Sequence, residues 1–209
     1  TDTAVSTYAL IRDETAERKA ATFLLGDNLE RTTQGGGIYT YTSQQGAAAF
    51  RDTGSFDAAG SLSQENAEAF CRDFCKAFSY DTPIFTLDET GSGTATAVRL
   101  WSGTPVFNAA VTFTIDQGRV LSASGALLPE TGAETSSGQK PLSAFAALTA
   151  FQQMRHASSS VVSSITEVSL CYELQSTTAA PMALVPSWRI VTDTATFYVN
   201  CISGTVRRA

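Results

Sequence analysis

The sequence is poor in the residues that carry most catalytic and metal chemistry. Its 209 residues include a single histidine, His156, which excludes most two- and three-histidine metal sites. The four cysteines are too few for a disulfide scaffold in a chain of this length. There is no P-loop, no G-x-G-x-x-G, no G-x-S-x-G and no H-E-x-x-H motif. We therefore expect no bound cofactor, no metal site and no enzymatic activity.

Charge is also scarce, at 16% of residues against about 25% in an average globular protein. Only three residues are lysine, and 14 basic against 20 acidic residues give a formal net charge of -6. Phosphate neutralisation supplies most of the affinity for nucleic acid, so this acidic chain is not expected to bind it. No run approaches the roughly 18 apolar residues of a membrane span, and no signal-peptide pattern is present.

Three segments have the spacing of amphipathic helices. The first begins at Asp13, a capping residue, and stops near Gly26. The second spans about Ser63 to Phe78, with Ser61 or Ser63 as N-cap, and the third follows Pro141. The apolar stripe of the second helix consists of Ala67, Phe70, Cys71, Phe74 and Phe78, and that of the third of Leu142, Phe145, Leu148 and Phe151. We expect both stripes to pack on a sheet, with Phe74 buried.

Runs rich in β-branched and aromatic residues follow each helix and predict antiparallel strands. Segments 111–120 and 197–206 resemble one another, with Gly118 aligned to Gly204, and Gly46 marks a degenerate first copy. A loop is expected at 129–138. The pattern predicts an α+β fold of repeated helix-plus-antiparallel-sheet units that pack as two lobes, an N-terminal unit over 1–90 and a C-terminal unit over 91–209.

The C-terminal segment resembles the closing hairpin of PepSY-like modules, and more closely that of the YycH/YycI regulatory proteins of Gram-positive bacteria. The residues that carry this resemblance are Pro186-Ser187-Trp188, then Phe197-Tyr198-Val199-Asn200 and Ser203-Gly204-Thr205-Val206. Upstream, Leu170-Cys171-Tyr172 stands where that family has L-G-Y, and Gly103-Thr104-Pro105-Val106-Phe107 resembles its G-x-P-x-F segment. The resemblance covers about residues 95–206. Cys171 and Cys201 depart from it, and residues 1–90 match only in the order of elements.

The resemblance implies a PepSY- or cystatin-like fold and a non-enzymatic protein outside the cytoplasm, anchored to the cell membrane by one N-terminal helix that these 209 residues do not contain. There it would bind and tune a sensor histidine kinase that controls cell-wall metabolism. A resemblance to the wider PepSY-like group alone would instead imply an extracytoplasmic ligand- or peptide-binding domain. A deep polar pocket would favour a ligand, and a broad exposed surface a protein partner.

Two aromatic residues are candidates for partner contact. Trp101 stands at the end of a predicted strand and either lines a binding groove or packs under a helix, which is the commoner role of tryptophan. Tyr198 alternates with Phe197, so one of the two should face solvent. Trp188, in contrast, is expected to pack under the third helix.

The cysteines fall into two pairs. Cys71 and Cys75 lie four residues apart on one helix and suit either a metal or redox pair or, more simply, buried inert thiols. Cys171 and Cys201 lie in two strands of the last unit and form a candidate disulfide if those strands are neighbours. In a simple meander a third strand would separate them.

The remaining chemistry-bearing residues have simpler interpretations. His156 beside Ser158 suggests a general base, but a histidine at a helix C-terminus also satisfies the last carbonyls. Ser137 and Lys140 match the S-x-x-K of penicillin-recognising enzymes without its companion motifs. Carboxylate pairs such as Asp52 with Asp57 and Asp88 with Glu89 stand in loops, where charged residues are usually solvated.

Overall fold

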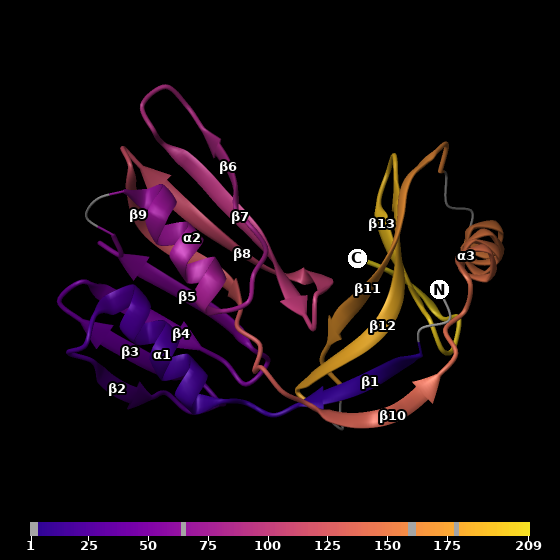
Figure 1. The fold of residues 1–209 in the computed structure, drawn as a ribbon, viewed down its shortest axis with the longest axis horizontal. Helices are drawn as coiled ribbons and strands as arrows, with labels where there is room; N and C mark the ends of the chain where they lie inside the picture. The colour runs from indigo at the N-terminus through magenta and orange to yellow at the C-terminus, as the bar shows by residue number, and fades with distance from the viewer. Residues whose placement is uncertain (1–3, 64–65, 159–161, 178–179) are drawn as a thin grey trace. The chain divides into compact units, whose positions relative to one another are not determined.

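The computed structural model describes residues 4–63, 66–158, 162–177 and 180–209, and this part of the chain forms three helices and fourteen strands (Figure 1). It divides into two compact units. The eight-stranded unit is Ile11–Thr131, and the six-stranded unit joins Thr1–Leu10 to Gly132–Ala209. The α+β class and the two antiparallel sheets predicted from the sequence are confirmed. None of the described helices is long and apolar enough to cross a bilayer.

The expected unit boundary at residue 90 differs from this division. Residue 90 lies in the turn between β6 (Ile84–Leu87) and β7 (Gly93–Trp101), which pair with each other in one hairpin. The first ten residues also belong to the C-terminal unit, because β1 (Val5–Leu10) pairs with β10 (Ala133–Gln139). Nothing local in the sequence marks a pairing across that separation, and a loop was expected at the place of β10.

The eight-stranded unit is one antiparallel sheet with α1 (Glu14–Leu25) and α2 (Ala67–Ala77) on the same face (Figure 1). Its strand order is β2 (Glu30–Thr33), β3 (Tyr39–Ser43), β4 (Gly46–Phe50), β5 (Ser55–Gly60), β9 (Arg119–Ala126), β8 (Thr104–Asp116), β7 and β6. As expected, Asp13 caps α1, accepting hydrogen bonds from the backbone N–H groups of Thr15 and Ala16, and Gly26 ends the helix.

The second helix confirms the predicted register. Phe74 is fully buried and Phe78 nearly so, and both pack with the sheet in one core, while Phe70 is half-buried at its margin. The helix begins later than predicted, because Asn66 is its N-cap and accepts a hydrogen bond from the N–H of Ala69. Ser63 has another role: its hydroxyl accepts a hydrogen bond from the N–H of Val120. Gln64, which would complete a capping box with Ser61, lies outside the described residues.

The longest strand pairing of the six-stranded unit joins β12 (Met182–Thr192) to β11 (Ile165–Gln175). The opposite edge of β12 is shared by β1 and β13 (Thr196–Asn200), and β13 pairs in turn with β14 (Val206–Arg208). The terminal hairpin β12–β13 is therefore antiparallel, as predicted from the sequence. The unit's helix is α3 (Ala144–Ser158).

The third helix differs from its predicted register at one end. Phe151 is buried and packs on Ile190 and Phe197. Trp188 is half-buried against the same core, where its indole N–H donates to the carbonyl of Leu142 at 2.8 Å. Phe145, however, is 80% exposed. The helix begins only at Ala144, so Phe145 lies in its first turn and does not continue the apolar stripe that packs on the sheet.

Three copies of one module make up most of the fold. Each is a helix followed by a four-stranded antiparallel meander: α1 with β2–β5, α2 with β6–β9, and α3 with β11–β14. We call them modules A, B and C. In B and C a backbone N–H at the start of the helix segment (Ala67, Leu142) donates to a carbonyl of the turn between the third and fourth strands (Gly118, Cys201). In A the guanidinium of Arg12 bonds the carbonyl at the end of the third strand.

The glycines of these turns confirm the repeat. Gly118 and Gly204 both stand between third and fourth strands, with φ of 76° and 74°. The equivalent residue of module A is Gly54, with φ of 83°, and not Gly46, which is the first residue of the third strand, β4. A positive φ is the conformation that glycine adopts without a steric penalty.

Replacing Gly118 by alanine should lower the free energy of unfolding by about 1–2 kcal/mol, because a Cβ at this φ is strained although no neighbouring atom lies within 4 Å. Urea unfolding followed by tryptophan fluorescence measures the change. Gly118→Asn is the control and should lose less, since asparagine tolerates the left-handed region. Equal losses for the two variants would mean that φ is not what this turn requires.

Candidate functional site

The two aromatic candidates for partner contact are both buried. Trp101 ends β7 and is 6% exposed, and Tyr198 in β13 is 4% exposed. Phe197 is buried as well, so the prediction that one of this pair faces solvent is wrong: both faces of β13 are covered. Burial also raises the pKa of Tyr198 to about 12. Their role in contacting a partner remains a prediction, but neither ring offers an exposed side chain to a docking surface.

All four cysteines are buried free thiols. Cys171 lies in β11 and Cys201 directly follows β13, so β12 runs between their strands, as in the simple meander considered above. The thiol of Cys171 donates to the carbonyl of Ser187 on that intervening strand at 3.4 Å. Non-adjacent strands are about twice the neighbour spacing of 4.7–4.9 Å apart, beyond the usual Cα separation of a disulfide.

We expect no cysteine of the folded protein to react readily with a thiol reagent at pH 8, because burial raises the pKa of each thiol to about 12 and keeps it protonated. A chromogenic disulfide reagent should count close to zero thiols in buffer and four in denaturant without reductant. A count of two in denaturant would instead reveal the Cys171–Cys201 disulfide.

The other chemistry-bearing residues do not come together in a catalytic arrangement. His156 is exposed in the last turn of α3, and the side chain of Ser158 lies outside the described residues. Ser137 belongs to strand β10 and not to the start of a helix; its side chain is likewise not described. No three His, Cys, Asp or Glu side chains of the described residues are grouped to hold a metal ion.

The carboxylates are engaged locally. Asp57 pairs with Arg51 at 2.6 Å, while Asp52 is exposed in the turn before β5. Asp88 accepts hydrogen bonds from Thr90 and Ser92 within its own turn, and these bonds lower its pKa. Such interactions keep an acid ionised and order a turn, which is not the raised pKa that a general acid needs.

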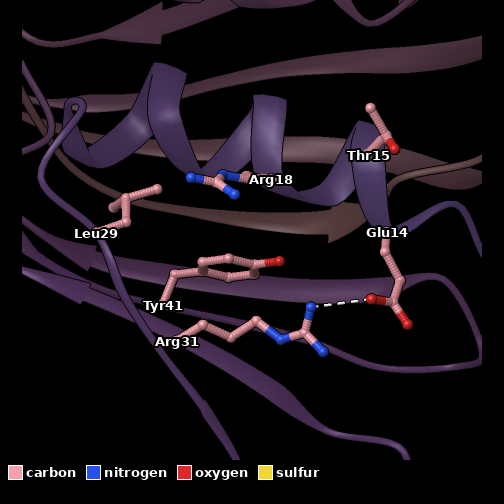
Figure 2. A pocket seen from close by; sticks show the side chains of 6 residues that line it. All are labelled: Glu14, Thr15, Arg18, Leu29, Arg31 and Tyr41. Atoms are coloured by element: carbon pink, nitrogen blue, oxygen red, sulfur yellow. Dashed lines mark hydrogen bonds and ion pairs between the residues drawn. The ribbon is translucent and has the colours of Figure 1, made fainter.

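A pocket of about 430 Å³ lies between α1 and the first strands of module A (Figure 2). Its walls are Glu14, Thr15 and Arg18 from the helix and Leu29, Arg31 and Tyr41 from the segment and strands beneath it. We call it the α1 pocket. Glu14 crosses its mouth to Arg31, with Oε2 and Nη1 2.9 Å apart (Figure 2).

Tyr39 does not line the pocket but contacts two residues that do, Glu14 and Arg31. The guanidinium carbons of Arg12 and Arg31 lie 3.8 and 4.0 Å from its ring centroid. Two guanidinium groups cannot share one ring face at that distance, so they stack on opposite faces. The Tyr39 hydroxyl donates to Glu14, and this bond, with that from Arg31, lowers the pKa of Glu14.

Arg12 is held in turn by Glu17, through Nε at 2.7 Å and Nη2 at 2.9 Å. Burial raises the pKa of Glu17, and the paired Arg12 opposes that shift. Arg18 is the exception in this cluster: within the described residues it makes no ion pair or hydrogen bond. The α1 pocket therefore offers one unengaged guanidinium beside the hydroxyls of Thr15 and Tyr41, a set that suits a carboxylate.

A second surface is the face of the eight-stranded sheet opposite its helices. The residues there alternate with the buried core residues, and direct cross-strand partners point to the same face. Two rows cross all eight strands: Thr86, Thr94, Thr114, Ser122, Ala59, Ala47, Thr42 and Glu30, then Ile84, Thr96, Thr112, Ser124, Asp57, Ala49, Thr40 and Thr32. We call them the threonine face. None is buried, and only Glu30 and Asp57 are charged.

Sequence reasoning missed both surfaces, for different reasons. The threonine face has a readable signal, since threonine or serine alternates with apolar residues at 94–97, 111–115 and 122–124. The α1 pocket has none, because its parts meet only when β2 and β3 fold back under α1.

No protein family model matches the chain, and no curated protein matches its sequence. Solved structures similar to it include an uncharacterized protein from Eubacterium rectale, with a TM-score of 0.53 and 12% identity over 99% of this chain and 81% of that one. The C-terminal domain of YpeB from Bacillus megaterium has a TM-score of 0.41 and 14% identity over 96% and 98% of the two chains. YycH from Bacillus subtilis has a TM-score of 0.43 and 13% identity over 100% of this chain and 51% of its own.

The likeness to the Eubacterium rectale protein is a likeness of fold. The YycH type suspected from the closing hairpin is among the structural neighbours, as is a YpeB domain, although identity is low in each case. They assign no activity or partner to this chain.

Proposed function

We propose that this chain is a non-enzymatic, extracytoplasmic regulatory module that binds and modulates a membrane sensor histidine kinase. The observation that carries the proposal is the threonine face. Its short side chains lose little conformational entropy when a protein surface covers them. Only two of its residues are charged, so few charged groups lose their hydration on binding. The resemblance of residues 95–206 to YycH/YycI proteins supplies the class of partner, the Gram-positive setting and the membrane anchor.

The mechanism is steric and conformational. A module that binds one conformation of the kinase ectodomain more tightly than the other shifts that equilibrium by its differential affinity. No chemical step is needed. Thiols with a pKa of about 12 are also slow to oxidise, so four free cysteines are compatible with a location outside the cytoplasm.

The test uses the purified ectodomains of the sensor histidine kinases of the source organism, immobilised for biolayer interferometry. One ectodomain should bind, and the double variant Thr96→Arg/Thr112→Arg, at the centre of the threonine face, should weaken it about tenfold or more. The control is Thr149→Arg, an exposed threonine of α3 in the other unit. Autophosphorylation of the full-length kinase in liposomes should then change with added module. Failure of every ectodomain to bind would refute the proposal.

The α1 pocket favours a second candidate, an extracytoplasmic ligand- or peptide-binding domain of the PepSY-like type. Its unengaged Arg18 and two hydroxyls suit a small carboxylate. Isothermal titration with acetate, glutamate and citrate tests this, with Arg18→Gln as the variant that should abolish the heat. Saturable binding lost in Arg18→Gln, without any kinase ectodomain bound, would favour this candidate.

A further inference from the structure

The three modules differ in what lies beside their fourth strand. In modules A and B the fourth strands β5 and β9 pair with each other antiparallel, from Ser55 opposite Ala126 to Ala59 opposite Ser122. Each strand therefore covers the open edge of the other. In module C the fourth strand is β14, which pairs with β13 and, within the described residues, with nothing on its other edge.

The backbone of β14 is set for a further strand. The carbonyl of Thr205 accepts from Asn200, and the N–H of Ala209 donates to Thr196, both at 2.9 Å. Antiparallel strands bond alternate residues to each neighbour, so the N–H and C=O groups of Val206 and Arg208 point to the open edge. Such a row of unpaired groups is a template for an extended segment.

The side chains of this edge select the segment by charge. Arg207 stands opposite Tyr198 and Arg208 opposite Phe197, so the two arginines lie on opposite faces of the sheet. Arg207 reaches Glu173 only at 3.6 Å, and Arg208 is exposed. In a chain of formal net charge -6, this is a basic strand.

A second copy of the chain is a poor occupant. A two-fold pairing of all three residues would place Arg207 opposite Arg207 of the second copy, and like charges directly opposite are destabilising. Acidic residues in the same positions would be stabilising cross-strand partners.

We propose that the open edge of β14 binds an extended acidic segment of a partner protein by antiparallel strand addition, in the place where β5 and β9 hold each other. Two successive acidic residues of that segment lie opposite Arg207 and Arg208. The proposal rests on the proposed function, because the segment belongs to the protein that the module regulates.

The test uses a fluorescein-labelled peptide of sequence TVTEEVTV and its counterpart TVTKKVTV, with the intact 209-residue chain. Fluorescence anisotropy at low salt should show the acidic peptide binding at least about tenfold more tightly. Arg208→Glu should reverse the preference. Arg119→Glu, the same change at an exposed arginine of β9, is the control and should leave both affinities unchanged.

A second pair of variants separates the contribution of the backbone hydrogen bonds to binding from that of the charge. Arg208→Gln removes the charge alone, whereas Arg208→Pro also removes the outward N–H, so the proline variant should bind the acidic peptide more weakly than the glutamine variant. Hydrogen exchange followed by NMR should show peptide-dependent protection of the Val206 and Arg208 amides, with little change at Arg207, which already bonds to β13.

Charge-independent binding, or protection at another strand edge instead, would overturn the proposal. The kinase ectodomain gives the separate measurement. If it binds wild type and Arg208→Glu equally, the edge is not the docking strand although the regulatory function stands. If no ectodomain binds, the regulatory function fails, and the peptide result still decides whether β14 accepts a strand.

Discussion

Replacing Phe74 by alanine should lower the free energy of unfolding of the eight-stranded unit by about 3–5 kcal/mol. The ring is completely buried and stands at the centre of an aromatic cluster that joins α2 to the sheet. Its neighbours, at centroid distances of 4.6–6.2 Å, are Phe23, Phe56, Phe78, Tyr80 and Phe113. Deletion of the ring removes contacts with both helices and with strands of modules A and B, so the cavity cannot be closed by one local shift.

Urea unfolding with circular dichroism measures this loss. Phe145→Ala makes the same chemical change at a ring that is 80% exposed and should alter stability by no more than about 0.5 kcal/mol. Ile84→Ala, at an exposed edge residue of the same unit as Phe74, is the second control. A loss below about 1 kcal/mol in Phe74→Ala would contradict the buried register of α2.

The burial of Phe74 could be predicted because its signal is local. The apolar positions of an amphipathic helix recur every three or four residues and can be recognised in a short segment. A two-residue hairpin such as that at Gly118 can be recognised from a glycine between two β-branched segments. The same reasoning aligned Gly118 with Gly204 correctly. For module A it named Gly46, which was wrong. Gly54 carries a weaker signal, because the strand that follows it, Ser55–Gly60, lacks the β-branched residues that mark the others.

What the sequence could not show depends on distant pairing. β1 and β10 meet across more than 120 residues, and no local pattern carries that information. β2 is four exposed polar residues that become a strand only beside β3. The α1 pocket follows from that pairing, since Arg31 reaches Tyr39 and Glu14 only when β2 lies at the sheet edge. The cysteines illustrate the limit: the meander argument correctly placed a strand between Cys171 and Cys201, without settling the redox state.

Replacing Arg99 by methionine should lower the free energy of unfolding by about 2–4 kcal/mol. Arg99 is 1% exposed near the C-terminal end of β7. Its guanidinium donates to the carbonyls of Ser79, Leu100 and Leu128 at 2.7, 3.0 and 3.2 Å and pairs with Glu130 at 3.1 Å. Methionine fills much of the volume but removes the donor from the buried carbonyl of Leu128 and one donor each from the part-buried carbonyls of Leu100 and Ser79. The Ser79 carbonyl still accepts from the N–H of Leu100. A buried carbonyl left unsatisfied costs about 1–3 kcal/mol.

Arg99 stabilises the fold because its planar guanidinium has several N–H donors and bonds two segments together, the one after α2 and the one after β9. Arg99→Lys keeps the charge but has no fork, so it should recover only part of the loss. Arg51→Met is the control: it removes an arginine whose ion pair with Asp57 is partly exposed, and should cost no more than about 1 kcal/mol. Full recovery in Arg99→Lys would show that charge alone matters here.

Arg99 and Phe74 should also be coupled, because Tyr80 lies between them. Its ring centroid is 6.0 Å from that of Phe74 and 5.8 Å from the guanidinium carbon of Arg99, and its hydroxyl donates to the carbonyl of Ala126 at 2.7 Å. Either substitution frees the Tyr80 ring, so the second should cost less in the background of the first. A double-mutant cycle should give a coupling free energy of at least about 0.5 kcal/mol. If the two losses of stability are strictly additive, the aromatic cluster around Phe74 and the hydrogen bonds of Arg99 are independent, and Tyr80 does not couple them.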